Sequence, residues 1–226
     1  MGFWAKFWTN LPYFLETLIP AAATTIEVTA GAFVLAVVVG LLLALLQRAK
    51  FDLVRKAVRT YIEIVRGTPV LAQLFILYFG LAEFGLKFTP LQAAILGLGL
   101  NGAAYLAEIF RAGIQSIHAG QMEAALTVGM TPLAAMRYVI LPQALGVVVP
   151  PTANYSIALL KDTAVVSAVA APEIMFRARN LVMETYLSMQ IYILVALMYL
   201  VLSFALSRVA VALERRLAVG RVGRAG

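Results

Sequence analysis

The chain has 226 residues, of which 62% are hydrophobic and only 13% are charged, and its formal net charge is +7. Soluble domains carry about 25% charged residues, and several apolar runs here exceed the roughly 18 residues that mark a membrane helix, so an ordinary soluble domain is excluded. The chain has no cysteine and one histidine, His118, which excludes disulfide frameworks, cysteine nucleophiles and histidine-rich metal sites.

The N-terminal part of the chain predicts a lead segment and a first membrane span. Residues 1–19 form a short amphipathic lead whose aromatic residues suit a membrane interface, on the outer side. The apolar run that follows, at about 20–46, is too long for the core of a signal peptide and is predicted to be retained. A densely basic segment, 47–60, separates it from a second span at about 61–82.

The tripeptide Gly67-Thr68-Pro69 interrupts the second span near its start. One interpretation is a simple kink. The other is irregular backbone lining a transport pathway, as in the broken helices of transporters, where a polar substrate would meet Thr68 and exposed amides. Gln73 would then face either the pathway or a partner span.

Three further spans complete an all-α fold. The third lies at about 89–110 and the fourth at about 143–171, and the segment between them, 111–142, contains too many helix breakers to cross a membrane. A loop leads to the fifth span at about 189–213, and a basic tail, 214–226, follows. The sequence therefore predicts a polytopic membrane protein with about five transmembrane helices spread over residues 20–213.

Lysine and arginine are distributed unequally between the segments that separate the spans. Thirteen fall in segments 47–66 and 111–142 and at the C-terminal end from Arg208 onward, against four in the alternating segments. Cytoplasmic segments carry the excess, so the N-terminus should lie outside and the C-terminus in the cytoplasm. Because these charges cluster between apolar runs, the net charge indicates membrane topology and not nucleic-acid binding.

The segment between the third and fourth spans predicts a helix-turn-helix at the cytoplasmic face. Residues 121–128 are good helix formers, and Gly129 stands where a helix end needs a residue that accepts positive φ. Thr131 offers an N-cap hydroxyl, and Pro132 fits the first position of a second helix. That helix should stop before or at Pro142. From local physics alone, an ordinary connecting loop is the open alternative.

The fourth span carries the adjacent charges Lys161 and Asp162. Charges at membrane depth are costly unless paired or facing water, which marks them as functional candidates. Pro150-Pro151 should break the helix, so that a helix restarting there places Lys161 about 15 Å along it. Adjacent residues do not face each other on a helix, so the two should have different partners. The alternative is that both only hold neighbouring helices together. Asn154 lies between the break and this pair.

Two other pairs of opposite charge stand three residues apart, Glu63 with Arg66 and Glu108 with Arg111. This spacing brings two side chains to the same face of a helix. Each pair is therefore predicted to form a structural salt bridge.

Several short motifs occur in a fixed order along the chain. Glu123-Ala124-Ala125 is followed by Gly129 and, eleven residues after that glycine, by Ile140-Leu141-Pro142. The other segments of the set are Glu63–Pro69, Gln73–Gly80, Ala104–Arg111, Leu141–Ala144, Pro150-Pro151, Asn154 and Leu160–Thr163. Together they resemble the permeases of binding-protein-dependent ABC importers, in the polar amino-acid (histidine, glutamine, arginine and glutamate) subfamily, over about residues 20–213. Ala164, where relatives often carry serine, and His118, where proline is frequent, depart from the pattern.

The resemblance implies that segment 111–142 is the EAA loop, whose coupling helix sits in a groove of a cytosolic ATPase subunit. Glu123, Ala124, Ala125 and Gly129 would then transmit mechanical force and perform no catalysis. The pathway candidates combine this resemblance with the intramembrane polar residues; they are Gly67, Thr68, Gln73, Asn154, Lys161 and Asp162.

The resemblance also implies a set of partners. They are an ATP-binding cassette ATPase dimer, a second permease chain that is identical or homologous, and a periplasmic or extracellular amino-acid-binding protein, all acting at the bacterial cytoplasmic (inner) membrane and its lipid. This chain has no Gly-x-x-x-x-Gly-Lys-Ser/Thr loop, so we expect no cofactor here, with ATP and Mg²⁺ bound by the ATPase. No catalytic or metal-binding residue is assigned.

Two other function classes were compared with the importer. A stand-alone secondary transporter could use Lys161 and Asp162 for ion coupling, but the Glu-Ala-Ala loop and the lack of an inverted repeat argue against it. A membrane enzyme would need clustered catalytic residues, which one histidine and no cysteine do not provide. Because Lys161 and Asp162 have opposite charges, they do not select one substrate, and a zwitterionic amino acid satisfies both.

Overall fold

The computed structural model describes residues 2–222, with the side chains of residue 213 and of residues 216–222 outside the description. All regular secondary structure in this range is helical. The helices are α1 (Phe3–Leu46), α2 (Asp52–Gly67), α3 (Val70–Phe75), α4 (Leu81–Glu83), α5 (Pro90–Gln115), α6 (Ala119–Thr127), α7 (Pro132–Ala135), α8 (Leu141–Asp162), α9 (Ile174–Thr185) and α10 (Ser188–Val222). Two π-helical turns, Ile76–Gly80 and Met136–Ile140, and a 3-10 helix, Thr163–Val169, join some of these elements.

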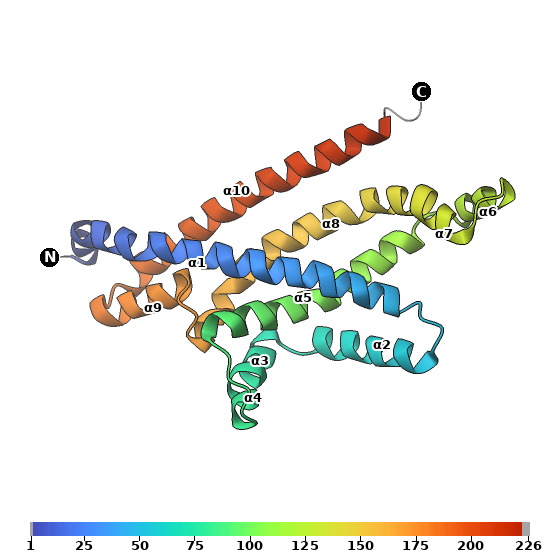
Figure 1. Cartoon of the computed structure of the whole chain (residues 1–226). Helices are drawn as coiled ribbons and strands as arrows, with labels where there is room; N and C mark the ends of the chain where they lie inside the picture. Colours follow the sequence, from blue (N-terminus) through green and yellow to red (C-terminus); the bar gives the residue numbers. More distant parts are fainter. Residues whose placement is uncertain (1, 223–226) are drawn as a thin grey trace.

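Four helices are long and apolar enough to cross a membrane, and the bent pair formed by α2 with α3 and α4 makes a fifth when it is taken as one span. This agrees with the predicted all-α fold of about five spans. α1, α5 and α8 run side by side, α10 diverges from them toward its C-terminal end, and α3 and α4 project away from the bundle (Figure 1). The last four residues of the predicted tail, 223–226, lie outside the described residues.

Close packing of α1 on α5 forms the centre of the bundle. Small residues at every fourth position of α1 are buried there: Ala32, Ala36, Gly40 and Ala44. A Cβ atom on Gly40 would come within 3.0 Å of the Leu106 Cβ and 3.1 Å of the Ala103 carbonyl oxygen. Small residues at such spacing let two helices in a membrane approach closely, so this glycine fixes the separation of α1 from α5.

From Phe3 onward the predicted lead, 1–19, is helical and continues into the first span without a break, even though α1 contains Pro12 and Pro20. Phe14 and Leu18 are fully buried and pack against residues of α9 and α10. The lead is therefore part of the packed bundle. Each proline costs a backbone hydrogen bond, and burial of these large side chains offsets that cost.

Two predicted helix ends are wrong. The prediction that Pro150-Pro151 breaks the fourth span fails, because α8 runs through both prolines. The second helix of the predicted helix-turn-helix also does not stop at Pro142. The backbone N–H of Leu141 donates to the carbonyl of Met136, five residues back, so a wider π turn immediately precedes Pro142 and accommodates its missing donor.

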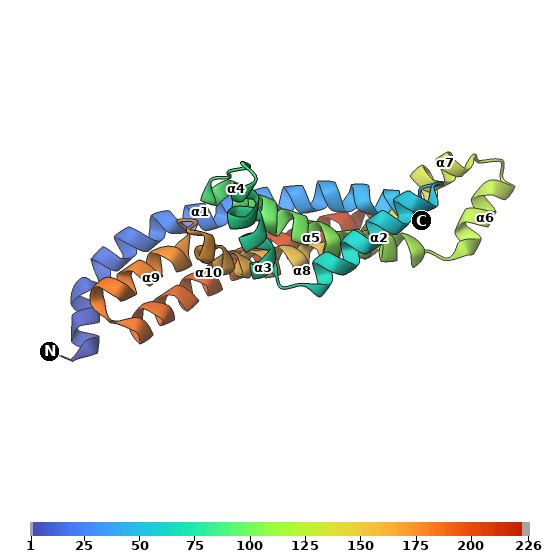
Figure 2. The same cartoon turned by 90° about the horizontal axis from the view of Figure 1, so that it is seen from below.

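The elements divide between two ends of the molecule. The α1–α2 connection, α6 with α7, and the C-terminal end of α10 lie at one end, whereas the N-terminus and α9 lie at the other (Figures 1 and 2). Segments 47–60 and 111–142, which carry most of the excess positive charge outside the tail, thus lie together. We call this the basic end; its placement in the cytoplasm remains a prediction.

Candidate functional site

The break in the second span is a sharp bend. α2 and the helical segment from α3 to α4 meet at 108°, which is larger than a simple kink. Thr68 is extended, and the Gln73 side-chain amide donates to its hydroxyl at 2.8 Å and to the Val65 carbonyl at 2.8 Å. Gln73 therefore supplies donors that the interrupted helix lacks. The Asn101 side-chain amide, on α5, donates to the side-chain oxygen Oε1 of Gln73 at 3.1 Å. This contact fixes the bend against the third span.

A row of charged and aromatic side chains extends from α2 across α5 to α8. The Arg66 guanidinium carbon lies 5.3 Å from the centre of the Tyr105 ring. Tyr105 stacks on Tyr155, with ring centres 6.1 Å apart and planes 21° apart. Asp162 stands seven residues after Tyr155, and this spacing returns to nearly the same side of a helix. We call Arg66, Tyr105, Tyr155 and Asp162 the aromatic row.

The predicted Glu63–Arg66 salt bridge is wrong. The salt bridges found among the described residues join Asp52 to Arg55 and Lys56, and Glu108 to Arg111. Arg66 instead turns toward α5, where the face of the Tyr105 ring attracts its cation. The predicted Glu108–Arg111 pair is confirmed, with a shortest distance of 2.6 Å.

The remaining pathway candidates are distributed around these two features. Lys161 and Asp162 are exposed in the last turn of α8, and adjacent positions on a helix point about 100° apart. Asn154 is also exposed, and it shares a side of α8 with Lys161, seven residues later. Around Gly67 the space is open, because a Cβ atom there would meet nothing within 4 Å. The structure thus brings together Thr68 and Gln73 at the bend and adds Asp162 to the row, with Asn154 and Lys161 beside it.

Tyr155 is a site residue that the sequence analysis missed. Its hydroxyl lies close to α5, since a Cβ atom on Gly102 would come within 2.5 Å of that oxygen. The seven-residue spacing from Tyr155 to Asp162 is visible in the sequence. The stacking on Tyr105 is not, because it depends on how α5 and α8 pack.

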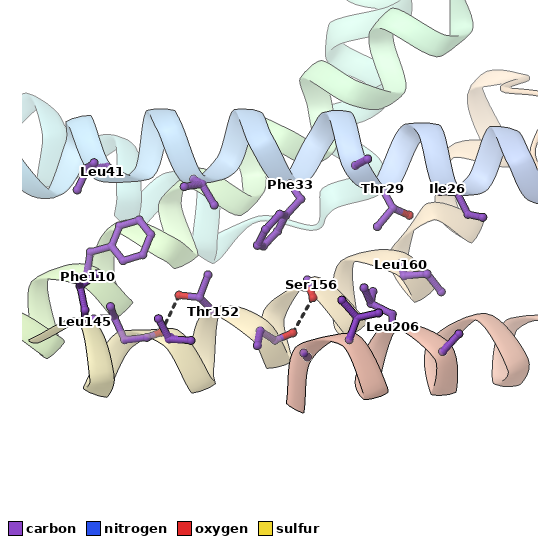
Figure 3. Close-up of a pocket in the computed structure, with 18 of the residues that line it drawn as sticks. Ile26, Thr29, Phe33, Leu41, Phe110, Leu145, Thr152, Ser156, Leu160 and Leu206 are labelled. Carbon is purple, nitrogen blue, oxygen red and sulfur yellow. Dashed lines mark hydrogen bonds between the residues drawn. The ribbon is translucent and has the colours of Figure 1, made fainter. Parts of the chain in front are cut away.

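An apolar cavity in the middle of the bundle is not suited to a polar ligand. It has a volume of about 790 Å³ and lies between α1, α5, α8 and α10, where Figure 3 shows its mainly aliphatic and aromatic lining. Thr29, Thr152 and Ser156 contribute hydroxyls, but each donates at 2.7 Å to a carbonyl of its own helix. A zwitterion would lose its hydration here without gaining partners.

The helix-turn-helix of segment 111–142 has the predicted capping. α6 ends at Thr127, and Gly129, two residues later, has a φ of +85°. The Thr131 hydroxyl accepts a hydrogen bond from the Ala134 N–H at 3.3 Å. Glu123 and Ala124 are exposed, whereas Ala125 is buried. α6 and α7 lie at the extremity of the basic end (Figure 1). Ala125 therefore anchors α6, and Glu123, Ala124 and Gly129 are available to a partner.

The apolar residues of this segment are unusually exposed. Val128 is 77% exposed and Leu133 is 78% exposed. Large apolar side chains that gather at one extremity of a molecule mark an interaction surface. The exposure of Val128 and Leu133 was not predicted, because hydrophobicity alone does not show which side of a helix is covered.

Glu173 is a buried acid that the sequence analysis also missed. It precedes α9 and accepts hydrogen bonds from the N–H groups of Met175 at 2.8 Å and Phe176 at 2.7 Å, and from the Tyr199 hydroxyl at 2.7 Å. Burial raises the pKa of this carboxyl above its usual value, and the three hydrogen bonds offset only part of that effect. Its position before an apolar helix, as an N-cap acid, was the available signal.

Known proteins with similar sequences are membrane transport components. The chain is 36% identical over 208 residues to the probable glutamine ABC transporter permease protein GlnM of Bacillus subtilis, covering 92% of this chain and 94% of that protein. It is 31% identical over 218 residues to the glutamine transport system permease protein GlnP of Escherichia coli, covering 96% of this chain and 98% of that protein.

A solved structure supports the same relationship. A chain of the structure described as an amino acid ABC transporter with histidines is 36% identical, covers 96% of this chain and 99% of its own, and superimposes with a TM-score of 0.84. The methionine ABC transporter MetNI in an inward-facing conformation, 24% identical with a TM-score of 0.64, shares the fold. The model of the family described as binding-protein-dependent transport system inner membrane component matches residues 36–219, and the chain therefore belongs to this family.

Proposed function

We propose that this chain is the membrane-spanning permease subunit of an ATP-driven importer for polar amino acids. The aromatic row carries this proposal, because it presents a guanidinium in α2 and a carboxylate in α8 with two tyrosine rings between them. A free amino acid has an α-carboxylate and an α-ammonium. Arg66 can hold the carboxylate and Asp162 the ammonium, through charge-assisted hydrogen bonds at successive positions along the row, because the two groups of one amino acid are too close together to reach both residues at once.

Transporters typically build their substrate pathway from broken helices, and the 108° bend supplies such a break. The Gln73 side-chain amide donates to the carbonyls of Val65 and Thr68, at 2.8 and 3.2 Å, so the backbone at Gly67 and Thr68 stays ordered without a continuous helix. These residues, with Asn154 and Lys161 beside the row, form the wall along which the substrate passes. One chain supplies half of the pathway, and a second permease chain, identical or homologous, supplies the other half.

The energy comes from ATP hydrolysis on a separate subunit. This chain has no phosphate-binding loop of the Gly-x-x-x-x-Gly-Lys-Ser/Thr type, so ATP and Mg²⁺ belong to the ATPase dimer. The exposed side of α6, with Glu123 and Ala124, sits in a groove of that dimer, and Val128 and Leu133 add apolar area to the contact. Opening and closing of the ATPase dimer moves α6, which is connected through α7 to α8 and hence to Asp162.

The basic end faces the cytoplasm of a bacterial cell, in its cytoplasmic membrane. The N-terminus and α9 then face outward, where an amino-acid-binding protein docks and releases its ligand. This orientation predicts that a protease added outside intact cells cleaves near α9 and leaves α6 untouched. Cleavage in α6 from the outside would reverse the topology.

The function is tested by purifying the tagged chain from native membranes and reconstituting the resulting complex in proteoliposomes. We expect a co-purifying ATPase, and uptake of at least one of the twenty labelled L-amino acids that requires ATP and the external binding protein. Transport by the chain alone, driven by an ion gradient without ATP, would support a secondary transporter instead. ATP-dependent uptake of sugars or peptides, but of no amino acid, would overturn the substrate class.

A further inference from the structure

Another cavity, of about 420 Å³ and with a polar lining, lies at the basic end, between the C-terminal end of α1, the C-terminal half of α2 and the C-terminal end of α5. We call it the arginine pocket. Six charged side chains line it: Arg48, Arg59, Glu63, Arg66, Glu108 and Arg111. A volume between roughly 300 and 1,000 Å³ is typical of small-ligand pockets. The lining is polar and charged, in contrast to the apolar cavity of Figure 3.

Two of the six charges neutralise each other. Arg111 pairs with Glu108 at 2.6 Å and donates to Gln115 at 2.7 Å. Gln47 donates to Glu108 at 3.3 Å. The pair is therefore already supplied with partners and forms a fixed wall of the pocket.

The other arginines of the pocket are not held in close ion pairs. Among the residues that the structure describes, Arg48, Arg59 and Arg66 form no salt bridge, and neither does Glu63. Three arginines against one glutamate leave the pocket with an excess of positive charge. Guanidinium groups bind carboxylates through two parallel hydrogen bonds, and a concave surface of one sign concentrates the opposite ion. The pocket is therefore suited to an anionic group.

Arg66 connects this pocket with the aromatic row. It lines the pocket and also lies 5.3 Å from the centre of the Tyr105 ring. A carboxylate held at Arg66 can pass to Arg59 and Arg48 without leaving a guanidinium-lined surface. Glu63 lies in the same pocket and offers an acceptor for an ammonium group.

We infer that the arginine pocket is a second amino-acid binding site, which receives the α-carboxylate of the translocated amino acid at the cytoplasmic exit of the pathway. The inference rests on the proposed function and extends it with Arg48 and Arg59, which no motif had singled out. The pocket recognises the α-amino and α-carboxylate groups that all substrates share. The other ligand suited to its charge is the phosphate of an anionic phospholipid, which the experiment distinguishes.

The test uses the absence of cysteine in the chain. Gln115→Cys introduces one thiol at the pocket, and a charged maleimide labels it in the purified complex reconstituted in phosphatidylcholine vesicles. A mixture of the twenty L-amino acids should slow labelling of the permease band by roughly tenfold at saturation, since only empty pockets react. Mannitol at the same osmolarity should leave the labelling rate unchanged.

Charge variants show whether the arginines hold the ligand. In the Gln115→Cys background, Arg59→Gln should raise the half-protecting concentration of the mixture by roughly tenfold, the effect of losing one charge-assisted contact, and Arg59→Lys should restore part of it. Arg55→Gln is the matched control, because Arg55 lies on the same helix but pairs with Asp52 at 2.9 Å and does not line the pocket. It should leave protection unchanged.

Two outcomes overturn the inference. In the first, the amino acids do not slow labelling, although the same vesicles still take up an amino acid. This result removes the binding site and leaves the proposed function intact. The other is protection that appears only when phosphatidylglycerol is added and does not depend on amino acids, which assigns the pocket to a lipid phosphate. If no amino acid is taken up by the same complex, the proposed function itself fails.

Discussion

The carboxylate of Glu173 and the hydroxyl of Tyr199 lie 2.7 Å apart, and this contact joins the start of α9 to the middle of α10. The same hydroxyl lies 3.5 Å from Thr163 Oγ1, in the segment that follows Asp162. Glu173 is fully buried. The Tyr199 hydroxyl therefore connects α10 both with the buried acid that precedes α9 and with the chain just beyond the aromatic row.

Glu173 gives the stability of the protein a pH dependence with a definite sign. Because its folded-state pKa is raised, the folded chain binds the proton more tightly than the unfolded chain. Its contribution is fully present below the ordinary glutamate pKa of about 4.3 and is lost as pH rises through the raised folded-state pKa. We therefore expect the melting temperature of the wild type minus that of Glu173→Gln, both measured in detergent, to fall as pH rises from the lower to the higher of those two pKa values. A difference that rises with pH would contradict the burial argument.

Tyr199→Phe removes one hydrogen bond from a buried carboxyl without changing the ring. We expect a loss of about 1–3 kcal/mol in the free energy of unfolding, the cost of leaving a buried acceptor less satisfied. Tyr192→Phe, on the same helix and 38% exposed, is the matched control and should change little. Equal melting temperatures for the two variants would show that the hydrogen bond from Tyr199 to Glu173 does not stabilise the protein.

Gly40→Ala tests the packing of α1 on α5. The added Cβ atom would lie 3.0–3.1 Å from Leu106 and the Ala103 carbonyl, so one helix must shift, at a cost of roughly 1–3 kcal/mol. Gly80→Ala is the control, because its Cβ atom would meet only Ile76 at 3.8 Å. Both melting temperatures are measured in the same detergent, and a Gly40→Ala variant as stable as Gly80→Ala would show that α1 and α5 are not tightly packed.

Gly129→Asp should abolish coupled transport and leave membrane insertion intact. Gly129 is exposed, with φ of +85°, and a negative side chain there obstructs the ATPase contact by its size and charge. Gly129→Asn is the matched variant, since asparagine and aspartate both tolerate positive φ, and it separates charge from backbone effects. The readout is substrate-stimulated ATPase activity of the reconstituted complex. A normal rate in Gly129→Asp would show that this turn does not couple the subunits.

Asp162→Ala should impair transport more than assembly. Asp162 is exposed at the end of α8, so its removal leaves no buried partner unsatisfied, but it takes away the acceptor for the substrate ammonium. We expect uptake to fall by roughly tenfold or more, the value of one charge-assisted contact, with unchanged yield of the complex. Asp52→Ala, an exposed acid outside the row, is the control. Wild-type uptake by Asp162→Ala would return this residue to a packing role.

Local residue patterns were enough to predict the class of the protein, the approximate number of spans and the capping of segment 111–142. Long apolar runs have only one stable state in a membrane, a helix with its backbone hydrogen bonds internal. The turn at Gly129 and the cap at Thr131 are also local, because each depends on residues within a few positions.

The remaining features depend on how the helices pack against one another. α8 continues through Pro142, Pro150 and Pro151, since a π turn and packing against neighbouring helices offset costs that are decisive in an isolated helix. Arg66 leaves its neighbour Glu63 for a ring on another helix. The aromatic row and the arginine pocket both join helices that are far apart in the chain, and contacts of that kind depend on how helices cross, which no spacing within one helix records.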